Sequence, residues 1–68
     1  MQVFVNSKQY LLPQTVTYLA DALPDFGITE PKGIAIAINN NVIPKTEWRQ
    51  YLLKSDDKIM IIRATQGG

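Results

Sequence analysis

The sequence predicts an α+β roll in which a five-stranded mixed sheet packs on one main helix. Three observations support this prediction: short runs that alternate with a period of two, a single stretch with helical spacing of apolar residues, and the order of these segments. The chain has 68 residues, of which 46% are hydrophobic. This length and composition indicate one folded domain with a small core.

The first predicted elements are two short strands. Val3 and Val5 alternate with Gln2, Phe4 and Asn6, and the turn-forming pair Asn6-Ser7 precedes a second run over residues 8–12. These two strands are expected to form a β-hairpin. Pro13 then ends the second strand.

The main helix is expected next. Thr15 stands where a helix N-cap should be, and four apolar residues follow at the spacing i, i+3, i+4, i+7. They are Val16, Leu19, Ala20 and Leu23. Pro24 should stop the helix, and residues 24–33, which contain two prolines and two glycines, are expected to be a loop without regular structure.

A second hairpin is expected after this loop. Residues 33–39 place isoleucines at one parity and alanines at the other, which is typical of a strand with both faces at least partly covered. The asparagines at 39–41 suit a turn into a short strand at Val42-Ile43, which Pro44 ends.

The final strand is expected over residues 58–63, after a turn or single helical turn within 45–53 and another turn at 55–57. The resulting order of strands and helix is that of a β-grasp roll, and we assign this domain to residues 1–63. The last strand runs directly into residues 64–68. We expect these to form a flexible C-terminal tail that could extend about 17 Å.

Composition argues against several classes of site. The chain has no cysteine and no histidine, and so lacks thiolate nucleophiles, imidazole bases and the usual zinc ligands. Its net charge of +1 is unlike the basic face of a nucleic-acid-binding protein. The N-terminus lacks the features of a secretory signal, and no apolar run is long enough to span a bilayer. We therefore expect a cytoplasmic protein that is not an enzyme and binds no metal, cofactor, nucleic acid or membrane.

The main candidate site is the C-terminal Gly67-Gly68. Two residues without side chains would let the backbone enter a narrow channel and leave the Gly68 carboxylate sterically open to reaction. A partner enzyme could activate this carboxylate with ATP as an acyl adenylate, and a sulfur nucleophile could convert the adenylate to a thiocarboxylate. The alternative interpretation is an ordinary frayed terminus.

A partner-docking surface is expected beside the tail. In the final strand Ile59 and Ile61 share one face, and Met60 and Ile62 share the other. If the first pair faces the helix, the second pair lies on the open side of the sheet as an apolar patch. The expected docking residues are Ala35, Ala37, Met60, Ile62 and Gln66. The alternative is that loops cover them.

Two other groups have simpler interpretations. Trp48 could line a binding surface with Tyr51 and Leu52, but this single tryptophan is expected to be a packing anchor instead. Asp56 and Asp57 are expected to be turn formers rather than a catalytic or metal-binding pair.

Several segments together resemble one known family, the ThiS sulfur carriers of thiamine biosynthesis. These are residues 35–39, Val42-Ile43-Pro44-Lys45 with Glu47-Trp48, Asp57-Lys58-Ile59 and Gln66-Gly67-Gly68. The resemblance covers nearly the whole chain. One departure is the turn before the last strand, where that family commonly shows Asp-Gly-Asp and this chain has Ser55-Asp56-Asp57.

The resemblance implies a ubiquitin-like β-grasp fold and a set of partners. It implies that a ThiF-like activating enzyme, using ATP and Mg²⁺, adenylates Gly68, with Gly67 as its unhindered neighbour. It further implies that sulfur from a sulfur donor protein is installed there as a thiocarboxylate. Thiazole synthase, a ThiG-like enzyme, would then receive the sulfur for the thiazole ring.

Two alternatives remain open at this point. The small-subunit sulfur carrier of molybdopterin synthesis shares the fold and the terminal Gly-Gly, although that family tends to be longer and lacks the Pro-Lys-x-Glu-Trp pattern. A non-catalytic β-grasp binding module, in which the terminal glycines are incidental, is the second alternative.

Overall fold

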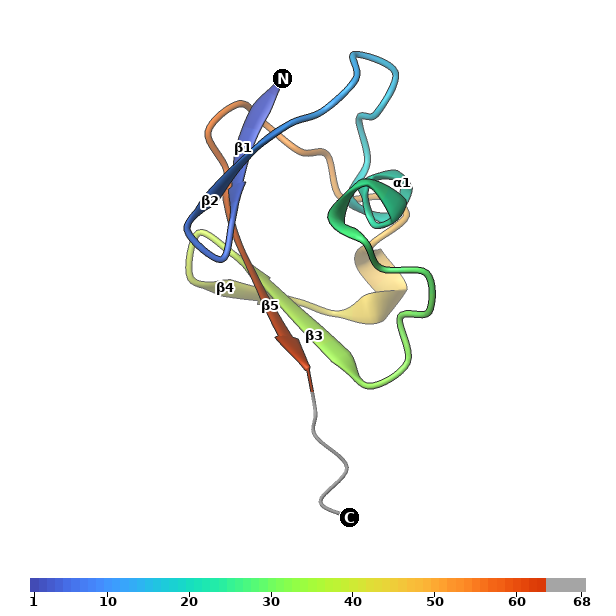
Figure 1. Cartoon of the computed structure of the whole chain (residues 1–68). Helices are drawn as coiled ribbons and strands as arrows, with labels where there is room; N and C mark the ends of the chain where they lie inside the picture. The colour runs from blue at the N-terminus through green and yellow to red at the C-terminus, as the bar shows by residue number, and fades with distance from the viewer. Residues whose placement is uncertain (64–68) are drawn as a thin grey trace.

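The computed structural model describes residues 1–63, so the tail expected over residues 64–68 lies outside the described residues. Figure 1 shows the elements along the chain. They are β1 (Gln2–Val5), β2 (Lys8–Leu11), α1 (Leu19–Ala22), β3 (Ile34–Ile38), β4 (Asn41–Ile43) and β5 (Lys58–Arg63). Two 3₁₀ turns, at Pro24–Phe26 and Lys45–Glu47, lie in the connections.

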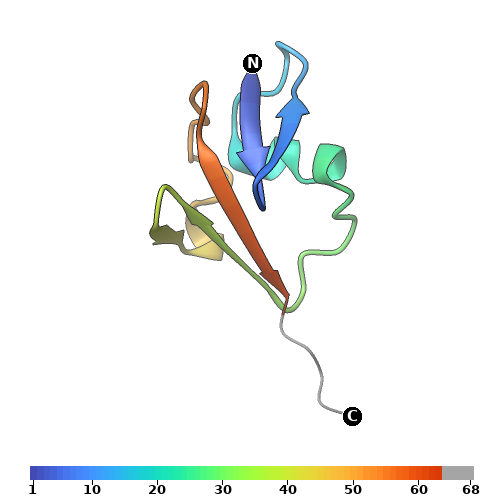
Figure 2. The same cartoon turned by 60° about the vertical axis from the view of Figure 1, so that its left-hand side comes forward.

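The five strands form one mixed sheet in the order β2-β1-β5-β3-β4. β5 lies between the two hairpins, parallel to β1 and antiparallel to β3. Figures 1 and 2 show α1 on one side of this sheet and β5 crossing its centre. The predicted five-stranded β-grasp roll is therefore confirmed.

Both hairpins turn on residues with left-handed backbone angles. Asn6 and Ser7 have φ of 50° and 70°, and Asn39 and Asn40 have φ of 51° and 72°. Two such residues in succession are characteristic of the type I′ turn, whose twist matches that of the paired strands. Asparagine tolerates these backbone angles better than most residues do. The two predicted hairpins and their turns are confirmed.

The predicted helix is much shorter than expected. The helix α1 covers only Leu19–Ala22, and its N-cap is Tyr18 rather than Thr15. Tyr18 is extended, with φ of −100° and ψ of 149°, and makes no capping hydrogen bond through its side chain. The assignment of Thr15 as N-cap was wrong, although the apolar stripe is buried as expected, with Val16, Leu19 and Leu23 in the core.

Pairing with a distant segment replaces the missing helical turn. Residues 15–17 are Thr-Val-Thr, three β-branched residues in a row, which disfavour a helix. The Thr17 carbonyl instead accepts a hydrogen bond from the Leu53 amide at 2.8 Å, and Tyr18 forms a bridge with Leu52. The chain therefore stays extended until Leu19.

The loop after α1 is more regular than expected. Pro24, which was expected only to stop the helix, occupies the first turn of the 3₁₀ segment, where a missing N–H costs nothing. The turn ends at Gly27, whose φ of 81° suits glycine. It carries Phe26 into the core, where the ring packs edge-on against Tyr10 with centroids 5.4 Å apart.

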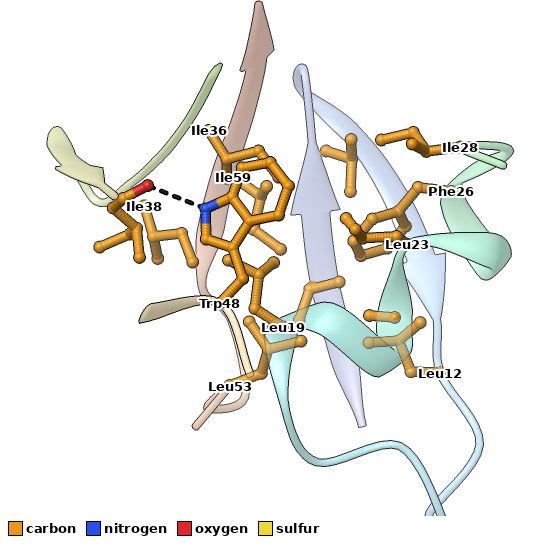
Figure 3. Close-up of a cluster of buried hydrophobic side chains, with 14 of the residues drawn as sticks. Leu12, Leu19, Leu23, Phe26, Ile28, Ile36, Ile38, Trp48, Leu53 and Ile59 are labelled. Carbon is orange, nitrogen blue, oxygen red and sulfur yellow. Dashed lines mark hydrogen bonds between the residues drawn. The ribbon is translucent and has the colours of Figure 1, made fainter. Parts of the chain in front are cut away.

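The core fills the space between the sheet and α1, as Figure 3 shows. Trp48 is 4% exposed, and its Nε1 donates a hydrogen bond to the Ile43 carbonyl oxygen at 2.8 Å. This bond satisfies the polar atom of a large apolar side chain, so the expected packing anchor is confirmed. No helix among residues 1–63 is long and apolar enough to cross a membrane.

Candidate functional site

The face of the sheet that points away from α1 carries an apolar patch. Met60 and Ile62 are 54% and 50% exposed, while Ile59, which alternates with them, is buried. In the register of β3 and β5, Ala37 is opposite Met60 and Ala35 is opposite Ile62. We call these four residues, Ala35, Ala37, Met60 and Ile62, the open-face patch.

The open-face patch lies where the sequence predicts it, and the alternation of side chains explains why. Isoleucine at 34, 36 and 38 is buried against α1, which leaves the alanines on the other face. Small side chains at Ala35 and Ala37 leave Met60 and Ile62 uncovered beside them. Gln66, the fifth expected docking residue, lies outside the described residues.

A hollow of about 570 Å³ continues the patch toward the hairpin turns. Phe4 and Met60 line it together with Ala37 and residues of both turns. The other end of the patch, at Ile62, is one residue from Arg63, the last residue of β5. The apolar surface therefore extends along β5 almost to the point where the described chain ends.

The two asparagine turns hold β5 from opposite sides. The Ile61 amide donates to Oδ1 of Asn6 at 2.9 Å, and the Lys58 amide donates to Oδ1 of Asn39 at 3.0 Å. The sequence identified both asparagines only as turn formers. Each asparagine is the first residue of its turn and lies next to the strand that inserts between the hairpins. This position is the signal that could have suggested hydrogen bonds from their side chains to β5.

The acidic turn before β5 is structural, as expected. Asp57 is 5% exposed and accepts hydrogen bonds from the Lys54 amide at 2.7 Å and from Nδ2 of Asn39 at 3.0 Å. Asp56 has φ of 69° and accepts a hydrogen bond from Gln2. Both carboxylates are therefore engaged in shaping the turn.

Tyr51 lies near this acidic turn. Burial raises the pKa of its hydroxyl above the ordinary value of 10.0, and the negative charge of Asp57 raises the pKa further. Within residues 1–63, no three acidic side chains come together in a way that could hold a metal ion. Gly67 and Gly68, the expected site of chemistry, lie outside the described residues.

Comparison with known proteins identifies the family. The family model described as "ThiS family" matches residues 1–68, the whole of the chain. The chain belongs to the ThiS family. This confirms the resemblance drawn from the sequence segments.

Individual ThiS relatives agree with this assignment. The sulfur carrier protein ThiS of Escherichia coli (strain K12) is 30% identical over 70 residues, and the match covers 100% of both chains. A crystal structure of the thiamine biosynthesis protein ThiS from Geobacter metallireducens matches with a TM-score of 0.83 at 16% identity, covering 100% of both chains. An NMR structure of a thiamine biosynthesis protein from that organism matches with a TM-score of 0.77 at 16% identity, covering 100% of this chain and 88% of the other. The structural matches show the ubiquitin-like β-grasp fold.

Proposed function

We propose that this chain is a sulfur carrier of thiamine biosynthesis that bears its sulfur on Gly68. The observation that carries the proposal is the match to the ThiS family along the whole chain, including the terminal Gly67-Gly68. The E. coli relative, named a sulfur carrier protein, supports it. In this proposal the protein is a substrate of its partners and acts in the cytoplasm.

The chemistry begins with activation of a carboxylate. A ThiF-like enzyme binds ATP with Mg²⁺, and an oxygen of the Gly68 carboxylate attacks the α-phosphorus, so that pyrophosphate leaves. Hydrosulfide supplied by a sulfur donor protein then attacks the carbonyl carbon, AMP leaves with the bonding electron pair, and loss of the proton leaves a thiocarboxylate on Gly68. The phosphate ester leaves far more readily than hydroxide would, which is why the free acid must first be adenylated.

The proposed partners dock on the open-face patch. Met60 and Ile62 present exposed apolar side chains on the strand that leads to the tail, and burying such a patch favours association. Met60 is three residues from Arg63, or about 10 Å along the strand. A partner bound to the patch would therefore receive the tail directly. Thiazole synthase, as the proposed acceptor, would use the same face after the activating enzyme has dissociated.

Intact mass spectrometry tests the carrier chemistry. The chain is incubated with ATP, Mg²⁺, sulfide and a ThiF-like enzyme whose activity has been verified on its own carrier. Replacing one oxygen by sulfur through the covalent acyl intermediate should add about 16 Da. A variant lacking Gly68 is the control and should gain nothing. Absence of the gain in the complete chain would refute the proposal and favour a binding module with incidental glycines.

A transfer assay tests the pathway. The thiocarboxylated chain is mixed with thiazole synthase and its other substrates, or with the large subunit of a molybdopterin synthase and the substrate that this enzyme sulfurates. Sulfur should appear in the thiazole product, while the second mixture should leave the thiocarboxylate intact. The reverse result would assign the chain to molybdopterin synthesis.

A further inference from the structure

β1 supports only the first half of β5. Their last paired residues are Val5 and Ile59, and the amide of Asn6 donates to the Ile59 carbonyl at 2.9 Å. At Asn6 the chain turns back into β2, so the backbone of β1 continues no further along β5. The second half of β5 therefore keeps backbone pairing with β3 alone.

The side chain of Asn6 extends the pairing by one more residue. Its Oδ1 accepts a hydrogen bond from the Ile61 amide at 2.9 Å, and its Nδ2 lies 3.5 Å from the Ile61 carbonyl oxygen. A carboxamide has the same donor and acceptor as a peptide group. If the parallel ladder continued, the backbone carbonyl of Asn6 would accept from the Ile61 amide, and the amide two residues further on would donate to the Ile61 carbonyl. The side chain of Asn6 supplies both contacts in their place.

Side-chain packing on this side of β5 is sparse. A hollow of about 440 Å³ lies between the first hairpin and this half of the strand, and its lining includes Lys8, Tyr10, Ile61 and Arg63. Among residues 1–63, the two bonds from Asn6 are the hydrogen bonds that join the first hairpin to β5 beyond Ile59. Asn6 therefore holds the second half of β5 to the first hairpin.

Asn39 is the matched group at the other end of β5. It is the first residue of the second hairpin turn, as Asn6 is of the first, and their φ values are 51° and 50°. Its Oδ1 accepts from the Lys58 amide at 3.0 Å. Asn39 therefore holds β5 at its first residue, and Asn6 holds it at Ile61, two residues before the strand ends.

We propose that Asn6 is a positioning residue that sets the direction in which β5 delivers the Gly68 carboxylate to a docked partner, an inference that rests on the proposed carrier function. Without the bonds to Ile61, the end of the strand keeps its pairing with β3 and can shift relative to the first hairpin across the hollow that lies between them. A swing of about 10° at Ile61 displaces Arg63 by about 1 Å, since two strand residues span about 6.6 Å. When a partner holds residues 64–68 extended in a narrow channel, a displacement of this size at their starting point reduces the fraction of complexes in which Gly68 has reactive geometry.

Steady-state adenylation measures this effect. Pyrophosphate release by the ThiF-like enzyme is followed at increasing concentrations of wild type, Asn6→Gly and Asn39→Gly. Glycine accepts the positive φ at both positions, so each substitution removes a side chain and leaves the turn in place. We expect kcat to fall about three- to tenfold for Asn6→Gly with KM within about twofold of wild type, and expect Asn39→Gly to keep the wild-type kcat.

A conservative variant and a stability measurement separate positioning from folding. Asn6→Asp keeps an oxygen for the Ile61 amide and should restore kcat to within about twofold of wild type. Denaturation of each variant in urea shows how much stability it has lost. The loss should be at least as large for Asn39→Gly, which also removes the donor to the buried Asp57 carboxylate, so a fall in kcat for Asn6→Gly alone is not explained by lost stability.

The outcomes distinguish this inference from the carrier proposal. If wild type is not adenylated at all, the carrier proposal fails. If wild type is adenylated and Asn6→Gly matches its kcat, positioning by Asn6 is refuted and the carrier proposal stands. A rise in KM at unchanged kcat would place Asn6 in docking and would also overturn the inference, as would an equal fall in kcat for Asn39→Gly.

Discussion

The indole of Trp48 is the largest side chain in the core and brings one polar atom with it. Its Nε1 satisfies the Ile43 carbonyl at 2.8 Å, which ties the 3₁₀ turn after β4 to that strand. We expect Trp48→Phe to lower the free energy of unfolding by about 1–3 kcal/mol, because it removes this bond and leaves unfilled volume. Urea denaturation followed by far-UV circular dichroism measures the change, since the variant has no tryptophan left to monitor.

Tyr18→Phe is the control for this variant, because Tyr18 is exposed. It should change the unfolding free energy by less than about 0.5 kcal/mol. A similarly small change for Trp48→Phe would show that the indole bond contributes nothing to stability.

Tyr51 makes the free energy of unfolding depend on pH in the alkaline range. Burial and the nearby Asp57 charge raise the pKa of its hydroxyl, so the folded state favours the neutral phenol. This contribution to stability is fully present below the unfolded pKa of 10.0 and is lost as pH rises through the higher folded pKa. The difference in urea midpoint between wild type and Tyr51→Phe should therefore be constant below pH 10.0 and shift in favour of the variant above it. A difference that stays constant across this range would contradict the raised pKa.

Among the elements, the first hairpin turn can be improved. Ser7 has φ of 70°, an angle that costs a residue with a side chain about 1 kcal/mol and costs glycine little. We expect Ser7→Gly to stabilise the fold by about 0.5–1 kcal/mol, because Asn-Gly is the preferred pair for this turn. Chemical denaturation of Ser7→Gly and Ser7→Ala provides the test. Only the glycine variant should gain stability, and a gain in both would point to a cause other than backbone strain.

The contrast between the hairpins and the helix shows what the sequence could predict. The hairpins depend on alternation and on turn residues such as Asn39-Asn40, which are local properties, and both were predicted correctly. The extent of α1 depends on hydrogen bonds to a segment more than thirty positions away, such as that between Thr17 and Leu53. The spacing of apolar residues shows which side chains are buried. It does not show where hydrogen bonds to another segment replace those of the helix.

The candidate site divides in the same way. The alternation of side chains along β5 correctly predicts that Met60 and Ile62 lie on the open face, because a period of two is a local property. The bonds of Asn6 to Ile61 and of Asn39 to Lys58 depend on how β5 inserts between two hairpins. The sequence therefore identified these asparagines as turn residues but did not reveal the hydrogen bonds that their side chains make to β5.

At the scale of the whole molecule, the open-face patch offers a test of docking. Met60→Glu places a charge within the patch and should raise KM for the proposed activating enzyme about tenfold or more, since burying an unpaired carboxylate is unfavourable. kcat should stay near the wild-type value, because the tail is unchanged. The measurement is pyrophosphate release as a function of carrier concentration.

Leu11→Glu is the matched control for Met60→Glu. Leu11 is an exposed apolar residue on β2, an edge strand, and one strand separates it from β5. Its substitution should leave KM within about twofold of wild type. Equal effects of the two variants would indicate a general response to added negative charge and would contradict docking at the patch.

The central place of β5 also determines when the protein can fold during its synthesis. On the ribosome the two hairpins emerge first, and the gap between β1 and β3 stays empty until residues 58–63 have left the exit tunnel. A chain interrupted before Lys58 leaves Val3 and Ile36, both fully buried in the finished fold, with a neighbouring strand on one side only. Such a fragment exposes apolar surface and unpaired strand edges to proteases and chaperones. The strand that leads to the C-terminus is thus also the strand whose arrival completes the sheet, so a nascent chain becomes folded and ready for its partners at the same stage.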